Sequence, residues 1–579
     1  MKYVTYFILL SLYLICGFTD APNVPTQGYP QDYFMSPVSH AMELTGNFGE
    51  LRPNHFHTGL DIRPAKSGES EPIFAAAEGY ISRIQIEPSG YGNLLEITHP
   101  NGFTSVYAHL DRLNDDIAAY TKENQYQRES FQVELFPTPN QFYVKKGQQI
   151  GMMGNTGGSQ GMHLHFEIRD AASGRPLNPL LFGIYVADQK PPTFYELRAY
   201  FLNGNNESYG SRSFSLRDKK GNYTIQNDTM TIPAERVGLG IRVYDEMDAL
   251  DNKNGIFAFE QYLDDALSYS YNFETVPFNE SRYLNAHLDY RAWKRANTYL
   301  NRCYRLPGNK LSVYKNTIND GVISLSTDHP TKVELRTKDV MGNEAKLTFW
   351  LQRSENIELP TAAPYSQVFE YQKANDFQNN EMALHLPEGC LYENVYFQYD
   401  MTQGASSAVY SPTHHLHEDY TPLHKGGELK IRPSGPIYDE LRSKYFLAYY
   451  DHSGDVSSCG GIWDGDMIKI RAYAFGDYCV MLDTIAPSIK PISFKTDLKN
   501  ASKMSFRVKD NFESARGAEG ISFRATVDGA WILMEYDPKY NSITHRFDNT
   551  KISAGEHQLK IVVKDNRANV RVFESLFMR

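Results

Sequence analysis

Three short histidine-containing segments in the first third of the chain carry the side chains best suited to chemistry. They are His57-Thr58-Gly59-Leu60-Asp61, Tyr107-Ala108-His109-Leu110 and Gly161-Met162-His163-Leu164-His165-Phe166-Glu167. Residues two apart in a β-strand point to the same face, so His163 and His165 should project into one groove. His57 and Asp61 lie in a glycine-containing turn that can bring both side chains to one point. Two imidazoles and one carboxylate would hold a zinc ion with a fourth position open to water, as in catalytic zinc sites.

Each segment alone has a simpler interpretation. A lone His-x-His in a strand is more often an ordinary polar pair, and a lone His-x-x-x-Asp is a weaker signal still. The three segments together, in this order and among glycine-rich turns, favour a metal site. The chain has no His-Glu-x-x-His motif, so a thermolysin-type arrangement is not expected.

Residues 47–170, about a fifth of the chain, resemble the lysostaphin-type zinc endopeptidases, which include LytM and other glycyl-glycine or murein endopeptidases. Besides the three segments, the resemblance rests on Asn47-Phe48-Gly49-Glu50, Ala75-Ala76-Ala77-Glu78-Gly79, Val144-Lys145-Lys146-Gly147-Gln148-Gln149-Ile150-Gly151 and Gly154-Asn155-Thr156-Gly157. It implies a mostly β, lysostaphin-like domain with an antiparallel β-sheet groove, of the duplicated hybrid motif type.

The resemblance also assigns roles to single residues. His57, Asp61 and His165 would bind Zn2+, while His109 and His163 would flank the metal and assist catalysis; it leaves their division of labour open. The implied activity is hydrolysis of peptide crosslinks in bacterial peptidoglycan by a metal-activated water. The alternatives are cleavage of glycine-rich protein, or a non-catalytic envelope scaffold or murein-hydrolase activator.

Composition and the N-terminus indicate where the protein works. A net charge of −11 argues against nucleic-acid binding by phosphate neutralisation. A basic start followed by the apolar stretch Tyr3–Phe18 predicts a signal peptide, residues 1–21, and export to the periplasm or cell envelope. Lipoprotein anchoring at Cys16 is less favoured, because Ile15 stands where a small residue is needed. No later segment is long and apolar enough for a membrane span. The partners that the resemblance implies are stem or crossbridge peptides of peptidoglycan.

The rest of the chain is predicted to form β-sandwich modules. Residues 22–187 would be the peptidase domain, followed by three β-sandwich or Ig-like units: a first module (188–354), a middle module (355–482) and a C-terminal module (483–579). Proline-containing junctions begin at Asp188 and Asp483. The segment Arg242–Asp245 matches Arg507–Asp510, and Lys338–Asn343 matches Lys564–Asn569, which indicates a repeat in the first and C-terminal modules.

Two insertions interrupt this plan. Residues 111–143 separate the Tyr-Ala-His-Leu and Val-Lys-Lys-Gly runs, which a short turn joins in compact members of the resembled family. The apolar residues of this insertion have helical spacing first and strand alternation later. We expect this insertion to fold and to form a wall or lid of the substrate groove. A second insertion, near 283–305, is predicted to contain helix.

Weaker features leave alternatives open. The run His414-His415-x-His417 is either a second metal site or a surface segment. Asp339 and Asp565 lie in turns that are either calcium-stabilised or ordinary. Among the cysteines after residue 21, a Cys459–Cys479 bridge competes with free thiols.

Overall fold

The computed structural model describes residues 28–356, 363–403, 408–548 and 551–579. The predicted signal peptide, with Cys16, lies outside these residues. Strands make up 44% of the chain and helices 8%, so the predicted mostly β fold is confirmed. Within the described residues, no helix has the length and hydropathy needed to cross a bilayer.

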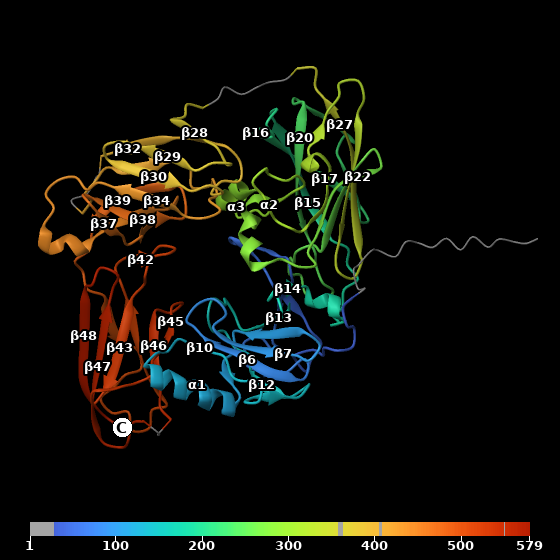
Figure 1. The fold of residues 1–579 in the computed structure, drawn as a ribbon. Coiled ribbons are helices and arrows are strands. Elements are labelled where there is room, and N and C mark those ends of the chain that lie inside the picture. The colour runs from blue at the N-terminus through green and yellow to red at the C-terminus, as the bar shows by residue number, and fades with distance from the viewer. Residues whose placement is uncertain (1–27, 357–362, 404–407, 549–550) are drawn as a thin grey trace, which may run out of the picture.

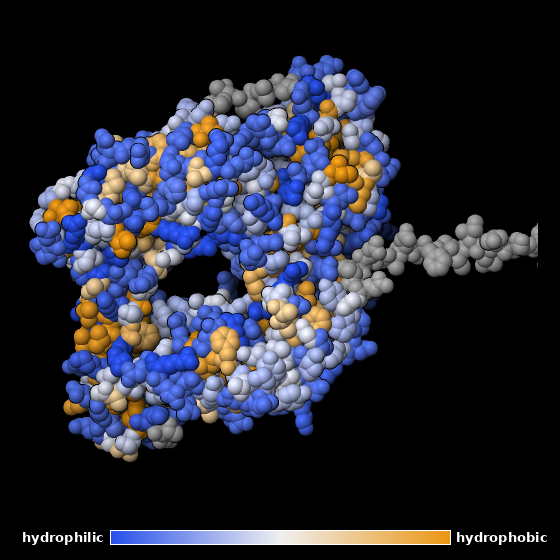
Figure 2. Space-filling view, in the orientation of Figure 1, coloured by the Kyte–Doolittle hydropathy of each residue, from blue (hydrophilic) through white to orange (hydrophobic). Residues whose placement is uncertain are grey.

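The four parts of the chain form a ring. In Figure 1 the N-terminal region (blue) and the C-terminal module (red) lie side by side, and the first module (green) and the middle module (orange) complete the circle. The space-filling view shows an opening through the centre of this face (Figure 2). The predicted module boundaries remain predictions, but each part has a hydrophobic cluster of its own.

The N-terminal region is built on a nine-stranded antiparallel sheet. Its main path is β1 (Leu44–Gly46), β4 (Leu60–Ile62), β13 (Leu164–Asp170), β8 (Phe103–Ala108), β7 (Asn93–Thr98), β6 (Gly79–Ile86) and β10 (Val133–Leu135), with β11 (Tyr143–Val144) on β6 and β14 (Pro176–Leu177) on β13. A smaller sheet contains β5 (Pro72–Phe74), β12 (Gln149–Met152) and β9 (Arg112–Leu113). In the register of the large sheet, His165 stands opposite Asp61 on β4 and Ala108 on β8. This register brings the three histidine segments to one place.

The insertion at 111–143 contains the predicted helix and strand, α1 (Asp115–Arg128) and β10. Asn114 caps α1 by accepting a hydrogen bond from the Ile117 amide. Strand β10 pairs with β6 at the sheet edge, with β6, β7 and β8 between it and β13. These two elements therefore do not form the predicted lid, because edge pairing carries them away from the histidines.

Helix α1 instead contacts the C-terminal module. The rings of Tyr126 and Trp531 meet edge to face with centroids 5.2 Å apart. Glu129 pairs with Arg524 at 2.6 Å, and Lys122 forms an ion pair with Asp548. This contact closes the ring seen in Figure 1.

The first module is a sandwich of two sheets around one core. One sheet contains β15 (Thr193–Leu202), β16 (Ser208–Phe214), β20 (Arg236–Tyr244), β23 (Asn301–Arg302) and β25 (Ile323–Ser324). The other contains β17 (Leu216–Lys219), β18 (Asn222–Ile225), β19 (Thr229–Ile232), β21 (Ala258–Leu263), β22 (Ala266–Asn272), β24 (Tyr314–Thr317), β26 (Thr331–Lys338) and β27 (Glu344–Arg353). The second insertion holds α2 (Leu284–His287) and α3 (Tyr290–Ala296), as predicted.

The N-terminal region and the first module share a core. Phe48 precedes the hairpin of β2 (Leu51–Arg52) and β3 (His55–Phe56), and Phe56 ends it. Both rings are buried in the first module's hydrophobic cluster. The Phe56 ring lies 5.3 Å from that of Phe273. Gly49, at a positive φ of 84°, leaves no room for a Cβ, which would meet Phe273 at 2.7 Å. The hairpin is therefore shaped to fit this module.

The other two modules are also paired sheets. The middle module contains β29 (Asn375–Gln378), β30 (Met382–Leu386), β34 (Gly427–Ile431), β38 (Met467–Ala472) and β37 (Ile462–Asp464) facing β32 (Tyr399–Thr402), β33 (Thr413–Leu416), β39 (Gly476–Leu482), β35 (Tyr445–Tyr450) and β36 (Val456–Ser458). The C-terminal module contains β40 (Ser488–Pro491), β41 (Lys503–Lys509), β46 (Ser542–Arg546) and β45 (Glu535–Asp537) facing β44 (Ala530–Trp531), β43 (Ser522–Val527), β47 (Glu556–Lys564) and β48 (Val570–Met578). Cys303, Cys390, Cys459 and Cys479 are free thiols.

Candidate metal centre

Three ligand-type atoms converge at the point where β4, β13 and the turn before β4 meet. His57 Nε2 lies 3.0 Å from Asp61 Oδ1 and 2.9 Å from His165 Nδ1, and His165 Nδ1 lies 3.0 Å from Asp61 Oδ1. Ligand atoms around a tetrahedral zinc ion with bonds of about 2.0–2.1 Å are about 3.3 Å apart. The triangle formed by His57 Nε2, Asp61 Oδ1 and His165 Nδ1 is thus only slightly smaller than a zinc ion requires.

Hydrogen bonds on the far side of each ring determine what these atoms can do. His57 Nδ1 lies 2.7 Å from the Asn47 carbonyl, and His165 Nε2 lies 2.8 Å from a carboxylate oxygen of Glu167. Both oxygens only accept, so these two ring nitrogens must be the donors. In the neutral rings the inner nitrogens then carry lone pairs, which face each other and the Asp61 carboxylate. With both rings neutral, three buried acceptors would face one another, which is the arrangement that a metal cation needs.

Without a metal ion, the electrostatics favour one proton inside this triangle of ligand atoms, on His165. Burial lowers the pKa of His57 to about 4, so this ring is neutral at pH 7. Burial alone would raise the pKa of Asp61, but the neighbouring imidazoles hold it well below its usual range. Burial alone would lower the pKa of His165, but hydrogen bonds to Asp61 and Glu167 raise it to about 9. A metal ion would take the position of the proton that His165 otherwise shares with Asp61.

The two other predicted histidines lie beside this triangle. His109 follows β8 at a positive φ of 62°, and its Nδ1 donates to the Thr156 carbonyl at 2.9 Å. Burial lowers the pKa of His109 to about 3, which leaves its Nε2 as a free acceptor. The ring of His163 lies 4.8 Å from that of His109, and its Nε2 is 3.3 Å from Asp61 Oδ1. The structure thus brings all five predicted site residues together; their separate roles remain predictions.

Known proteins resemble this part of the chain. Residues 55–126 and 133–179 match the description "Peptidase family M23". Lipoprotein NlpD of Yersinia enterocolitica is 35% identical over 112 residues, which are 19% of this chain and 89% of that protein. The chain belongs to peptidase family M23.

Other M23 relatives align over shorter shares of their length. The DD-carboxypeptidase/endopeptidase Mpg of Neisseria meningitidis serogroup B is 32% identical over 165 residues. These residues are 28% of this chain and 29% of Mpg. The murein hydrolase activator NlpD of Salmonella typhimurium is 34% identical over 136 residues, 24% of this chain and 28% of that protein. Among solved structures, the catalytic domain of lysostaphin from Staphylococcus simulans aligns at 24% identity with a TM-score of 0.17, covering 24% of this chain and 87% of that one. The middle module, at residues 366–483, matches the description "Zu5-like domain".

The M23 centre includes partners that the sequence did not reveal. Glu167 is fully buried and accepts hydrogen bonds from His165, Thr58, Tyr91 and Arg169. Burial would raise its pKa, but Arg169 and His165 hold it below its usual range. A signal for Glu167 existed, since it stands two residues after His165 on the same strand face.

Arg52 is the second partner that was missed. Its guanidinium donates to Asp61 Oδ2 at 2.6 Å, on the side of the carboxylate away from the triangle. It comes from the hairpin that packs into the first module, and nothing in its sequence spacing indicates this contact. The two partners fix the orientation of Asp61 and His165, which a metal site needs.

Other candidate sites lack this convergence. His414 Nδ1 contacts the Tyr399 hydroxyl, whereas His415 Nδ1 contacts Asp477. In the described part of the chain, neither these histidines nor His417 join a group of three ligand-type residues. The weaker alternative of a second histidine metal site is therefore not supported.

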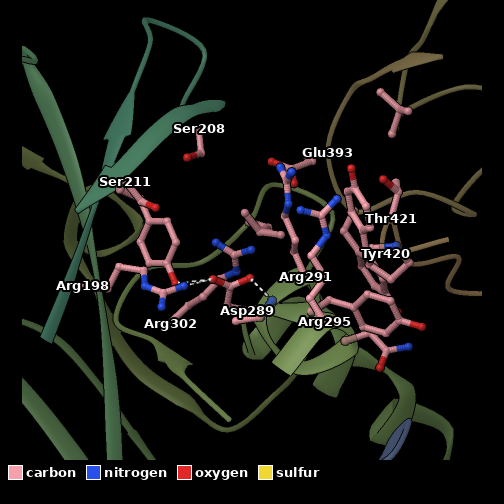
Figure 3. Close-up of a pocket in the computed structure, with 18 of the residues that line it drawn as sticks. Arg198, Ser208, Ser211, Asp289, Arg291, Arg295, Arg302, Glu393, Tyr420 and Thr421 are labelled. Atoms are coloured by element: carbon pink, nitrogen blue, oxygen red, sulfur yellow. Dashed lines mark hydrogen bonds and ion pairs between the residues drawn. The ribbon is translucent and has the colours of Figure 1, made fainter. Parts of the chain in front are cut away.

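A large cavity lies elsewhere, between the first and middle modules. It holds about 640 Å³, and Figure 3 shows the arginines of α3 beside Tyr420 on one side of it. Arg291 and Arg295 stack on Tyr420 at 4.5 and 4.2 Å. The cavity contains no group of histidines and carboxylates like that of the M23 centre, so cavity size does not locate the chemistry here.

Proposed function

We propose that this protein is an exported, zinc-dependent endopeptidase that hydrolyses peptide crosslinks of bacterial peptidoglycan. The observation that carries the proposal is the meeting of three ligand-type atoms, from His57, Asp61 and His165, next to two further imidazoles. Membership of family M23 and the printed name of the Mpg relative support a peptidase acting on the cell wall. The predicted signal peptide agrees with a substrate outside the cytoplasm.

The ligand set would hold zinc through one oxygen and two nitrogens. When bound, zinc acidifies a water molecule and polarises the carbonyl of the scissile peptide. Arg52 keeps Asp61 in its ligand orientation, and Glu167 keeps the Nδ1 lone pair of His165 directed at the metal position. These contacts preorganise the site before substrate arrives.

The imidazoles of His109 and His163 would assist the transfer of the proton from the attacking water. His109 is a candidate proton acceptor, because its Nδ1 hydrogen is engaged by Thr156, which leaves Nε2 for that role. His163 Nε2 lies 3.3 Å from Asp61 Oδ1, beside the metal position, and would hydrogen-bond the oxygen that becomes negative during attack. Such proton transfer contributes roughly 10²- to 10⁴-fold to rate.

The test combines metal analysis with product analysis. Purified full-length protein should contain one zinc and release crosslink fragments from peptidoglycan, identified by mass spectrometry. His165→Ala should lose both zinc and activity. His55→Ala is the matched control, because His55 is exposed, its ring hydrogen-bonds the Pro53 carbonyl, and it supplies no ligand atom, so the change should affect neither.

A second candidate is a murein-hydrolase activator, as the name of the Salmonella relative indicates for that protein. Zinc-loaded protein that releases no fragments by itself but accelerates a separate murein hydrolase would establish this alternative. Full zinc content in His165→Ala would instead show that the ligand assignment is wrong.

A further inference from the structure

Two groups of three aspartates lie far from the M23 centre. The first contains Asp188, Asp245 and Asp339, and the second contains Asp483, Asp510 and Asp565. Within each group, one carboxylate oxygen of every member lies within 4.8 Å of the others. Each group occupies the same place in its module: one aspartate in the entry junction, and one at the end of a strand in each of the two sheets.

The first group is held in position by an asparagine. Asn343 Nδ2 donates to Asp339 Oδ2 at 2.6 Å and to the backbone carbonyl of Asp188 at 3.3 Å. The Asn343 backbone amide also donates to Asp339 Oδ1, at 2.9 Å. The junction and the end of β26 are therefore linked before any ligand binds.

The second group repeats the arrangement. Asn569 Nδ2 donates to Asp565 Oδ2 at 2.8 Å and to the backbone carbonyl of Asp483 at 3.1 Å. Its backbone amide donates to Asp565 Oδ1, again at 2.8 Å. Two modules that differ in most other residues thus keep the same three carboxylates and the same asparagine.

The negative charge of the first group is not compensated by protein. Asp245 is 1% exposed, and its Oδ1 has no hydrogen-bond partner. Among the described residues, no Lys or Arg nitrogen forms an ion pair with Asp188, Asp245 or Asp339, although such pairs are common elsewhere in the chain. Burial and the neighbouring carboxylates raise the pKa of Asp245 well above its usual range. An unpaired carboxylate buried in this way is costly unless a cation accompanies it.

We propose that each aspartate group binds one Ca2+ ion, so that the protein carries two calcium sites in addition to its M23 centre. All the donors are oxygens, and neither group contains a histidine or cysteine, which disfavours zinc. Magnesium keeps several waters and is usually bound through one or two carboxylates, whereas calcium takes many protein oxygens. Three carboxylates in one group therefore favour calcium.

The position of the sites indicates what the ions do. Asp188 lies in the junction before β15, whereas Asp245 and Asp339 follow β20 and β26, which belong to opposite sheets. An ion there would fix the junction to both halves of the sandwich. In the second group, Asp483 directly follows β39 of the middle module, so the second ion would fix the junction into the C-terminal module. Calcium would stiffen two connections of the ring in Figure 1.

The test counts calcium on the full-length, zinc-loaded protein. After removal of free metal, calcium titration and elemental analysis should give two calcium ions per chain and unchanged zinc. Asp245→Asn and Asp510→Asn should each bind one, and the double variant none. Asp251→Asn is the control, because it removes an equal charge from an exposed position in the loop after Asp245 and should retain two.

Thermal melting separates a calcium ligand from a merely structural aspartate. Without calcium, Asp245→Asn should melt no lower than the unmodified protein, because it removes a buried, unpaired charge. With millimolar calcium, the unmodified protein should melt at a higher temperature than Asp245→Asn. The proposal is overturned if the unmodified protein binds no calcium at millimolar concentration, if it binds only magnesium, or if both single variants keep two ions.

Discussion

Replacing Glu167 by Gln should weaken zinc binding without removing any ligand atom. Glu167 Oε1 accepts the Nε2 hydrogen of His165 at 2.8 Å, and this bond sets which nitrogen of the ring faces the metal position. A neutral amide accepts that hydrogen more weakly. The amide also brings its own hydrogens toward Arg169, which now donates to Glu167 Oε2 at 2.6 Å.

The size of the effect follows from these contacts. A hydrogen bond to a charged group contributes about 1.5–3 kcal/mol. At about 1.4 kcal/mol per tenfold change, its loss weakens zinc binding about 10- to 100-fold, as found for outer partners of metal ligands. The fold should survive, because Arg169 keeps a second carboxylate, Glu96, at 2.9 Å. Destabilisation should therefore stay below the roughly 3–5 kcal/mol of a fully broken buried ion pair.

Zinc affinity measured by chelator competition, together with activity at saturating zinc, tests this expectation. Glu96→Gln is the matched control: Glu96 also pairs with Arg169 but does not contact His165. The control should leave zinc affinity within about threefold, since no ligand loses an outer partner. Equal affinities for both variants would refute the role given to Glu167.

Three further outcomes are expected. His109→Ala should keep its zinc but lose roughly 10²- to 10⁴-fold in kcat, and unchanged turnover would remove His109 from the mechanism. A fragment of residues 28–356 should fold and bind zinc, whereas a fragment of residues 28–187 should aggregate. In the shorter fragment, Phe48 and Phe56 are no longer buried by the first module, and this burial contributes about 3–6 kcal/mol. A monomeric, zinc-binding fragment of residues 28–187 would contradict this. Burial lowers the pKa of His287 to about 4 in the folded protein, whereas the unfolded chain has a value of about 6.5. The free energy of unfolding should therefore fall by about 3 kcal/mol for this group as the pH drops from about 6.5 toward 4. Chemical denaturation at pH 7 and pH 4.5 should show a smaller fall for His287→Gln, and an equal fall would exclude His287 as a source.

The sequence predicted the atoms of the M23 centre better than their supports. The five site residues lie in short segments whose type and spacing carry the signal. Glu167 lay in one of these segments, but a carboxylate in a strand has many uses and its role depends on what surrounds it. Arg52 could not be predicted, because its contact with Asp61 depends on how the β2–β3 hairpin packs.

The fold was predicted in the same unequal way. Strand alternation and helical spacing located α1 and β10 within the insertion, since these are local properties of the chain. The lid did not follow, because which sheet edge accepts β10 is a long-range choice. The packing of Phe48 and Phe56 into the first module was also not predicted. The sequence near an aromatic residue does not indicate whether its ring packs against its own domain or against another.

One chain of contacts joins the first aspartate group to the M23 centre. The backbones of Asp245 and Asn254 exchange hydrogen bonds of 3.0 and 2.8 Å. The next residue, Gly255, exchanges two more with the Asn47 side chain, at 2.9 and 2.7 Å. The Asn47 carbonyl in turn accepts the Nδ1 hydrogen of His57. These contacts tie the orientation of the Asn47 carbonyl, and so of the His57 ring, to the packing of the first module. The first module therefore helps to position a ligand of the M23 centre, although it supplies none of the ligands itself.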